Sequence, residues 1–363
     1  MQNGRKPLTK PLLFLLAAAV IVKVFTFSGH LVEAGFATGV YPYMAVILRF
    51  LTGWLPFSAG DVLYAAAAIW LLVRLVKLLG LLFKRKATWR GFLYGVGKTA
   101  IKLLCLYLVF NVLWGLNYYR QGISYQLKLG EGKYSTQDLQ RLTDTLVVRV
   151  NNSRRLLGDS SFSYPPNRQV FTAATQAYDS VALTYPFLRY RAKSIKPSLY
   201  GNFNNYLGFL GYYNPFTGEA QVNTTVPVYV QPFTTCHELG HQLGYAKENE
   251  ANFAGVLSAK SSTDSAFRYA LYFDLYSYAI RDLYRRDTSQ VAFFRNQLLP
   301  GVRADYANLR TFYQRYTNPF EPYIRKAYAN YLKANEQPMG MMSYNEVVAM
   351  VIAYIRKNGN DSI

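Results

Sequence analysis

Apolar residues are concentrated in three segments near the start of this 363-residue chain, and these segments restrict its possible folds more than any other feature. They cover about residues 8–28, 57–77 and 99–117. Each has close to the ~20 residues that an α-helix needs to cross a bilayer. No cleavage site of small residues follows the first segment before Phe25, so we expect it to remain as an anchor. The sequence therefore predicts a three-helix transmembrane region over residues 1–117 and a separate domain over residues 118–363.

A further apolar segment, residues 35–57, decides on which side of the membrane the second domain lies. It contains residues that are unfavourable in a lipid-exposed helix, namely Gly35, Gly39, Pro42, Arg49, Gly53 and Pro56. Basic residues cluster before the first span and after the second, at Arg5, Lys6, Lys10, Lys84, Arg85, Lys86, Arg90 and Lys98. Because basic loops remain in the cytoplasm, an even number of crossings separates these two clusters. We therefore expect residues 35–57 to be interfacial or re-entrant, the N-terminus to be cytoplasmic, and residues 118–363 to lie outside the cytoplasm.

The net charge of +20 does not indicate a nucleic-acid partner. The first 117 residues hold 13 Lys and Arg against Glu33 and Asp61, and much of this excess flanks the apolar segments, beside anionic lipid. Basic residues in the remainder are scattered and form no nucleic-acid-binding motif. The two cysteines, Cys105 in a span and Cys236 beside a histidine, are not placed to pair, and we expect Cys236 to be a packing residue.

The motif His-Glu-Leu-Gly-His at residues 237–241 contains two of the three histidines of the chain. His237 and His241 are four residues apart, so on a helix both imidazoles lie on one face and can bind the same metal ion. Glu238 lies about 100° around the helix, where its carboxylate can reach a metal-bound water without being a ligand. This combination is typical of a catalytic zinc site. The alternative is that both histidines are ordinary buried residues of a packed helix.

A third metal ligand has to come from outside the motif. The position of a third histidine in one common zinc pattern is Lys247, whose charged ammonium has no lone pair. The ligand is therefore predicted to be a carboxylate, Glu248 or Glu250, which lie about 200° apart on a helix and cannot both face the metal. Helical spacing favours Glu248, because its face continues through Asn252 and Gly255. These small residues allow a close approach of two helices, and the amide of Asn252 can brace a histidine ligand.

At these residues the chain resembles the glutamate-zincin (gluzincin) metallopeptidases, whose second helix carries a glutamate, an acid or amide four residues later, and often a glycine seven residues later. Glu248, Asn252 and Gly255 match that spacing, although asparagine replaces the commoner aspartate and the gap after His241 is short. A closer resemblance, to a family of bacterial integral-membrane zincins without an established substrate, extends over residues 211–223, 236–242, 248–253 and 331–335. The resemblance implies a zincin-like fold, a zinc ion as cofactor and a place in the bacterial inner (plasma) membrane.

The second domain is predicted to be α+β, mainly helical with a small β-sheet. A capping-box pattern at Ser135–Asp138 indicates a helix over residues 137–156. Further helices are predicted over residues 171–185, 264–286, 288–298, 302–316, 321–334 and 343–357. Residues 200–231, rich in glycine, asparagine and β-branched residues, are predicted to form short strands. Within them, residues 219–223 or 227–230 form either an edge strand that binds an extended peptide or an ordinary hairpin.

Tyrosine is abundant in the predicted helix over residues 264–286, at Tyr269, Tyr272, Tyr276, Tyr278 and Tyr284. Most of these side chains are expected to pack in the core. One tyrosine or arginine of the domain is expected to stabilise a tetrahedral oxyanion, because the domain has no spare histidine for that role. The sequence does not identify this residue.

These features favour a membrane-anchored zinc metallopeptidase that hydrolyses peptide bonds outside the cytoplasm. His237, His241 and Glu248 (alternatively Glu250) would hold Zn²⁺, and Glu238 would act as general base. Expected partners are membrane lipids and a peptide or protein of the cell envelope, and no organic cofactor is expected. Two alternatives use the same ligands: a non-catalytic zincin-like sensor or assembly protein with a structural zinc, and an amidase acting on other envelope amides. The sequence does not indicate the oligomeric state.

Overall fold

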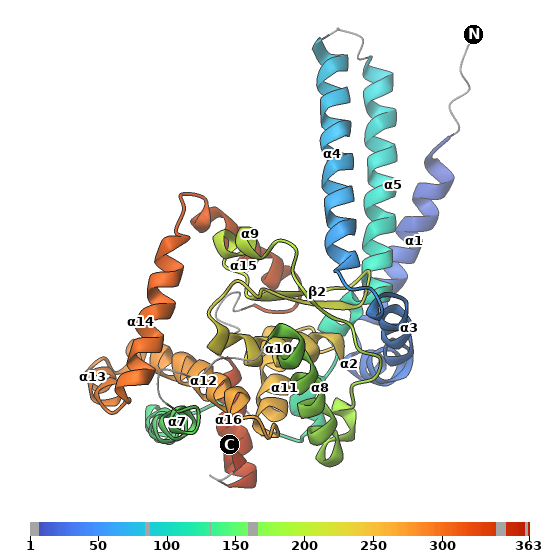
Figure 1. Cartoon of the computed structure of the whole chain (residues 1–363). Helices are drawn as coiled ribbons and strands as arrows, with labels where there is room; N and C mark the ends of the chain where they lie inside the picture. Colours follow the sequence, from blue (N-terminus) through green and yellow to red (C-terminus); the bar gives the residue numbers. More distant parts are fainter. Residues whose placement is uncertain (1–6, 84–87, 131, 159–165, 339–345, 360–361) are drawn as a thin grey trace.

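The computed structural model describes residues 7–83, 88–130, 132–158, 166–338, 346–359 and 362–363. It is mainly helical, with one small three-stranded sheet (Figure 1). Several basic residues on which the predicted topology depends lie outside the described residues, namely Arg5, Lys6, Lys84, Arg85 and Lys86.

Three N-terminal helices stand side by side and project from the rest of the molecule (Figure 1). They are α1 (Thr9–Phe25), α4 (Ala59–Phe83) and α5 (Trp89–Leu113). Their large apolar side chains are mostly exposed, and Lys102 of α5 lies 4.8 Å from the ring centre of Trp70 on α4. The start of α1, the end of α4 and the start of α5 lie at the end of this bundle farthest from the sheet (Figure 1). So much exposed apolar surface is characteristic of a membrane region.

By length and composition, three of the described helices are able to cross a membrane: Gly29–Gly53, Ala59–Leu81 and Trp89–Leu113. The 17-residue α1 is shorter than these three. In the most apolar part of helix 29–53, 33% of the residues are buried, against 0% and 6% in the other two. Helix 29–53 comprises α2 (Gly29–Leu31), the π-helical segment η1 (Val32–Val40) and α3 (Tyr41–Gly53). α2 and α3 lie at the base of the bundle (Figure 1). Because helix 29–53 is itself able to cross a membrane, whereas α1, the first predicted span, is not among the three, the interfacial or re-entrant placement of residues 35–57 stays a prediction.

The sheet has the strand order β1-β3-β2. Its strands are β1 (Ile195–Pro197), β2 (Gly211–Asn214) and β3 (Glu219–Val222). β3 pairs in parallel with β1 and antiparallel with β2. Of the two alternatives for residues 219–223, the hairpin is confirmed, because β3 pairs antiparallel with β2. The edge strand is wrong, because β1, which lies upstream of the predicted strand region, occupies the second side of β3.

The short strands predicted within residues 200–231 are confirmed as β2 and β3, but two parts of that range differ from the prediction. Residues 227–230 form no strand but contribute the 3₁₀ turn η4 (Val228–Val230). Gly201–Leu207 forms helix α9, which ends at Gly208 in the left-handed conformation (φ 78°). Glycine adopts this conformation without the steric cost that other residues incur, so Gly208 ends α9 before β2.

The α-helical part of the second domain agrees closely with the sequence. α10 (Gln231–Gln242) packs against β2 and β3, and α11 (Glu248–Lys260) packs along α10. α8 (Asn167–Thr184), α12 (Ser265–Arg286) and α16 (Glu346–Asn358) pack around this pair of helices. α7 (Thr136–Leu156) packs on α12 and α16. Farther out lie α13 (Ser289–Asn296), α14 (Pro300–Arg315) and α15 (Glu321–Ala334). The short turns are η2 (Gly115–Tyr119), α6 (Gly122–Gln126) and η3 (Pro186–Leu188). The predicted capping box of α7 is confirmed.

Buried carboxylates join the base of the bundle to the sheet. Glu219 of β3 accepts hydrogen bonds from the backbone N–H groups of Ala59 (3.1 Å) and Gly60 (2.6 Å), which are unpaired donors at the start of α4. Asp61 of α4 accepts from the backbone N–H of Leu199 (2.7 Å) and from the hydroxyl of Tyr212 on β2. These bonds hold α4 directly against the strands that cover α10.

Candidate metal centre

Helix α10 places the two motif histidines one turn apart, as predicted. The ring centres of His237 and His241 are 4.7 Å apart and the ring planes are nearly perpendicular, at 86°. Pro232 lies in the first turn of α10, where its missing N–H costs no helical hydrogen bond.

Glu248, the first residue of α11, completes a group of three possible metal ligands with His237 and His241. Its Oε2 atom lies 3.3 Å from His237 Nε2 and 3.6 Å from His241 Nε2. Two atoms that each lie about 2.0–2.1 Å from a tetrahedral zinc are separated by about 3.3–3.4 Å. Glu248 Oε2 is buried without a hydrogen-bond partner. The donor types, their spacing and this unpaired oxygen all fit a divalent metal ion.

The close approach of α10 and α11 depends on two glycines that face each other's helix. A Cβ at Gly240 would lie 2.9 Å from the backbone oxygen of Ala251, and a Cβ at Gly255 would lie 3.3 Å from the backbone nitrogen of His237. Any larger side chain at either position would push the helices apart. The role predicted for Gly255, to allow this approach, is confirmed.

Glu250, the alternative third ligand, points away from the histidines. Its carboxylate lies against Gly122, where an added Cβ would be 1.7 Å from Glu250 Oε1. Burial raises its pKa, while the charges of Lys247 and Arg120 oppose that rise. Glu248 is therefore the carboxylate that the fold brings to the candidate metal site.

Glu238 is buried beside the three ligand groups and against strand β2. A Cβ at Gly211 would lie 2.5 Å from Glu238 Oε1, so this glycine leaves the space that the carboxylate fills. Glu238 Oε2 has no hydrogen-bond partner. Burial raises the pKa of Glu238 to about 7, an effect that the two histidines partly offset. A carboxylate that titrates near neutral pH is suited to general acid–base chemistry.

The histidines differ in how the surrounding protein orients them. His241 Nδ1 lies 2.8 Å from the backbone oxygen of Tyr245, so the proton resides on Nδ1 and the Nε2 lone pair is left for a metal. His237 Nδ1 and Asn252 Nδ2 are both buried without a hydrogen-bond partner. The bracing contact predicted for Asn252 is therefore absent between these described residues, although its side chain is buried in α11.

The candidate metal site stabilises a positive charge next to the Glu248 carboxylate. Burial opposes the ionisation of Glu248, but the proximity of His237 and His241 outweighs burial and holds the pKa of Glu248 well below its usual range. Burial likewise opposes the protonation of His241, but Glu248 raises the pKa of His241 to about 9. A divalent cation would supply the same compensating charge.

Two residues near the C-terminus hold Glu248, and the sequence analysis did not identify either. The hydroxyl of Tyr328 on α15 donates to Glu248 Oε1 (2.9 Å), and Gln337 Oε1 accepts from the backbone N–H of Glu248 (2.9 Å). Tyr328 leaves Oε2 free to face the histidines. Only the short motif at residues 331–335 hinted that this region belongs to the site.

The N-terminal region also supports helix α10, and no pattern in the sequence predicts this contact. The backbone oxygen of Gln242, at the end of α10, accepts from Tyr41 Oη (3.0 Å) and Arg49 Nη1 (2.9 Å) of α3. A second buried arginine, Arg120, donates to the backbone oxygen of Gly244 (3.1 Å) and pairs with Glu33 (2.8 Å). Helix 29–53 is thus part of the structure that positions His241.

The remaining predictions on single residues are mostly confirmed. Tyr269, Tyr272 and Tyr276 are buried core residues, and Tyr284 is exposed. Cys236 is buried, both cysteines are free, and burial raises the pKa of the Cys236 thiol to about 12, which suits a packing residue.

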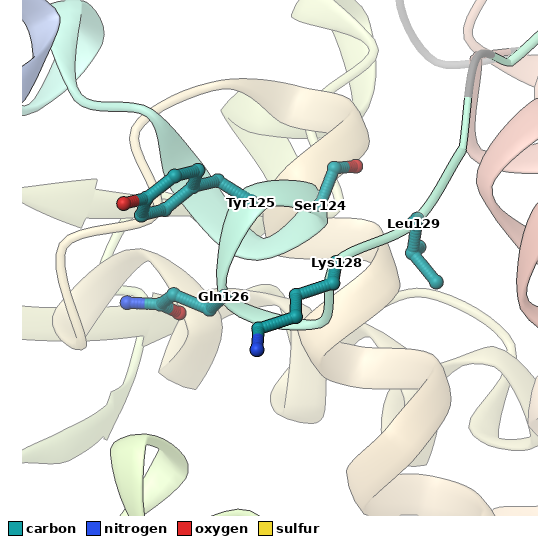
Figure 2. Close-up of a pocket in the computed structure, with 5 residues that line it drawn as sticks. All are labelled: Ser124, Tyr125, Gln126, Lys128 and Leu129. Carbon is teal, nitrogen blue, oxygen red and sulfur yellow. The ribbon is translucent and has the colours of Figure 1, made fainter.

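A separate surface hollow lies on and after α6, and none of the candidate ligands lines it (Figure 2). It is formed by Ser124, Tyr125, Gln126, Lys128 and Leu129. Gln126 also donates to Glu33 Oε1 (3.0 Å) and accepts from the hydroxyl of Tyr245 (2.7 Å). Gln126 therefore supports the loop after α10, and the hollow itself contains no group suited to metal chemistry.

A family model described as "Protein of unknown function (DUF3810)" matches residues 36–352 of the chain. The match begins within helix 29–53 and includes α4, α5, the sheet and the candidate metal site. No curated protein and no solved structure matches the chain.

Proposed function

We propose that this chain, which belongs to the DUF3810 family of proteins of unknown function, is a membrane-anchored zinc-dependent metallopeptidase with a zincin-like second domain. The observation that carries the proposal is the approach of Glu248 Oε2 to within 3.3 and 3.6 Å of the two histidine Nε2 atoms, beside the buried Glu238. A site that held zinc only to stabilise the fold would not need a further buried carboxylate whose pKa lies near neutral pH.

In this proposal His237, His241 and Glu248 hold Zn²⁺, which when bound would lower the pKa of a water molecule and polarise a scissile carbonyl. Glu238 accepts a proton from the attacking water and passes it to the leaving amine. Its raised pKa suits both transfers, since a pKa near the working pH allows a group to gain and lose a proton.

Strand β2 is suited to bind an extended peptide beside Glu238. The backbone N–H of Asn223 donates to the oxygen of Leu210, which identifies the hydrogen-bonded pairs between β2 and β3. By the alternation of an antiparallel ladder, the backbone groups of Gly211 and Tyr213 point away from β3, towards the free edge. An extended substrate that paired with them would lie along the strand that touches the general base.

The arrangement of the bundle supports an extracytoplasmic active site. If α1, α4 and α5 cross the membrane, their three crossings place the second domain on the side opposite the start of α1 (Figure 1). The basic residues before α1 and around the α4–α5 connection mark that far end as cytoplasmic. We therefore assign the second domain to the outer side of a bacterial inner membrane, where its substrate would be a peptide or protein of the envelope.

The first test is the metal content of the purified full-length protein. We expect about one zinc per chain, lost in His237→Ala and retained in the control His30→Ala, which changes the one histidine outside the motif. A folded protein that contains no zinc and binds none would refute the proposal.

The second test separates catalysis from a structural metal. Glu238→Gln is expected to keep zinc and stability but to lose peptide cleavage, because glutamine cannot accept the proton. Unchanged cellular function with intact metal would favour the sensor or assembly hypothesis. Peptides or other envelope amides that remain bound to the Glu238→Gln protein would identify the substrate class.

A further inference from the structure

A group of exposed aromatic and aliphatic side chains lies on the second domain, outside the membrane bundle. It consists of Leu199, Phe203 and Tyr206 in and before α9, and of Phe320 and Tyr323 at the start of α15. We call these five residues the aromatic surface. Phe203 is 61% exposed, Phe320 70% and Tyr323 74%, so nothing in the described structure covers them.

Specific contacts join the two parts of the aromatic surface. The ring of Tyr206 meets the ring of Tyr316 edge to face, with the centres 5.1 Å apart. Asn318 donates from its side chain to the backbone oxygen of Tyr206 (2.9 Å). The α14–α15 connection is therefore held against α9.

The aromatic surface is continuous with the base of the bundle. Leu199 donates its backbone N–H to Asp61 (2.7 Å), and Tyr200 donates its hydroxyl to the backbone oxygen of Asp61 (2.7 Å). The next residues of α4, Val62 and Leu63, are exposed apolar residues of a candidate membrane span. α9 and the end of α14 lie on the side of the domain from which the bundle projects (Figure 1).

Basic residues flank, in the sequence, the part of the aromatic surface that comes from α15. Residues 310–333 contain Arg310, Arg315, Arg325, Lys326 and Lys333, and their only acidic residue is Glu321. Glu321 pairs with Arg325 (2.8 Å), which leaves the segment positively charged. Tyrosine and phenylalanine flanked by lysine and arginine are typical of surfaces that sit in the headgroup region of anionic membranes.

We propose that the aromatic surface is a second membrane contact, which inserts into the same bilayer leaflet that α4 leaves at Asp61. The bilayer is the occupant that the observations favour, because the surface continues from a membrane helix, faces the membrane side and carries basic residues. Tyr328 of α15 also holds Glu248 (2.9 Å), so this contact would keep the candidate metal site close to the bilayer surface. The proposal requires membrane anchoring, but it does not require metal binding or peptidase activity.

Spin labels on the full-length protein in vesicles of phosphatidylethanolamine and phosphatidylglycerol test this contact. In a Cys105→Ser background, in which the remaining Cys236 is buried, a nitroxide is attached at Phe203→Cys or Phe320→Cys. Leu183→Cys is the matched control, since Leu183 is 87% exposed and belongs to α8, a helix that lies on the other side of the sheet from α9 (Figure 1). All three positions are exposed, so the substitutions leave the core intact.

We expect the labels at residues 203 and 320 to collide mainly with oxygen, which concentrates in lipid, and the label at residue 183 mainly with a water-soluble nickel complex. A label at residue 203 or 320 that is as accessible to nickel as the control would overturn the proposal. Protection of either label from both reagents would indicate a protein partner and would also overturn it. Neither outcome would bear on zinc binding or catalysis, which the metal and Glu238→Gln measurements address separately.

Discussion

The substitution Gly211→Ala tests whether strand β2 positions the general base. The new Cβ would lie 2.5 Å from Glu238 Oε1, 2.8 Å from Glu238 Cγ and 2.9 Å from the backbone oxygen of Gln221, whereas ordinary contacts begin at 3.4 Å. Gln221 belongs to the central strand and cannot move easily, so the Glu238 carboxylate has to shift by about 0.9 Å to restore normal contact. A displacement of about 1 Å at a reacting group can cost about 10²-fold in rate, and overpacking costs about 1–3 kcal/mol of stability.

We therefore expect Gly211→Ala to reduce the rate of peptide cleavage by about 10²-fold while zinc content stays at about one per chain, because no ligand is displaced. Cleavage is measured on a peptide library, and stability by thermal unfolding of the solubilised full-length protein. Gly130→Ala is the matched control, since no atom of the described residues lies within 4 Å of its added Cβ. If Gly211→Ala cleaved and unfolded like this control, Glu238 would not lie against β2, and the proposed placement of substrate would be wrong.

Three further predictions concern the third candidate ligand, the support of α10 and the membrane orientation of the second domain. Glu248→Gln should lower zinc content sharply while Glu250→Gln retains it, because only Glu248 faces the histidines; metal analysis showing the reverse would make Glu250 the ligand. Arg49→Met should lower the free energy of unfolding by about 1.5–3 kcal/mol, because it removes a charged donor to the backbone oxygen of Gln242 at the end of α10. Denaturant unfolding equal to wild type would show that this hydrogen bond does not contribute to stability. Export-dependent reporters should be active at the C-terminus and inactive in the α4–α5 connection, and the opposite pattern would place the domain in the cytoplasm.

The elements that the sequence predicted well depend on local information. The capping box at Ser135 begins α7 through contacts within four residues, and the helix over residues 321–334 was predicted with its observed limits. The spacing of His237, Glu238 and His241 likewise determines their relative directions on any helix, so the core of the site was visible before the fold was known.

The errors concern pairings between distant segments. The residue pattern of a short strand does not depend on whether one or both of its edges are paired. The sequence of residues 219–223 therefore could not predict that β1 lies beside them. Residues 201–207 were expected to be extended because of their glycine and asparagine content, but α9 forms where Asn204 and Asn205 are buried against the sheet region. In both cases tertiary contacts outweighed local preference.

By itself, the sequence predicted an apolar N-terminal region, most of the second domain's helices and a candidate metal motif, because each is a periodic or local pattern. Helical spacing already favoured Glu248 over Glu250, but only the packing of α11 on α10, through Gly240 and Gly255, brings the Glu248 carboxylate to the two histidines. The tertiary structure also places Arg49, from the N-terminal region, at the end of α10. It places Tyr328, from the C-terminal region, against Glu248. Hydrogen bonds between residues about 80 to 190 positions apart produce no recognisable pattern in a single sequence, because the segment between the two residues can have almost any composition.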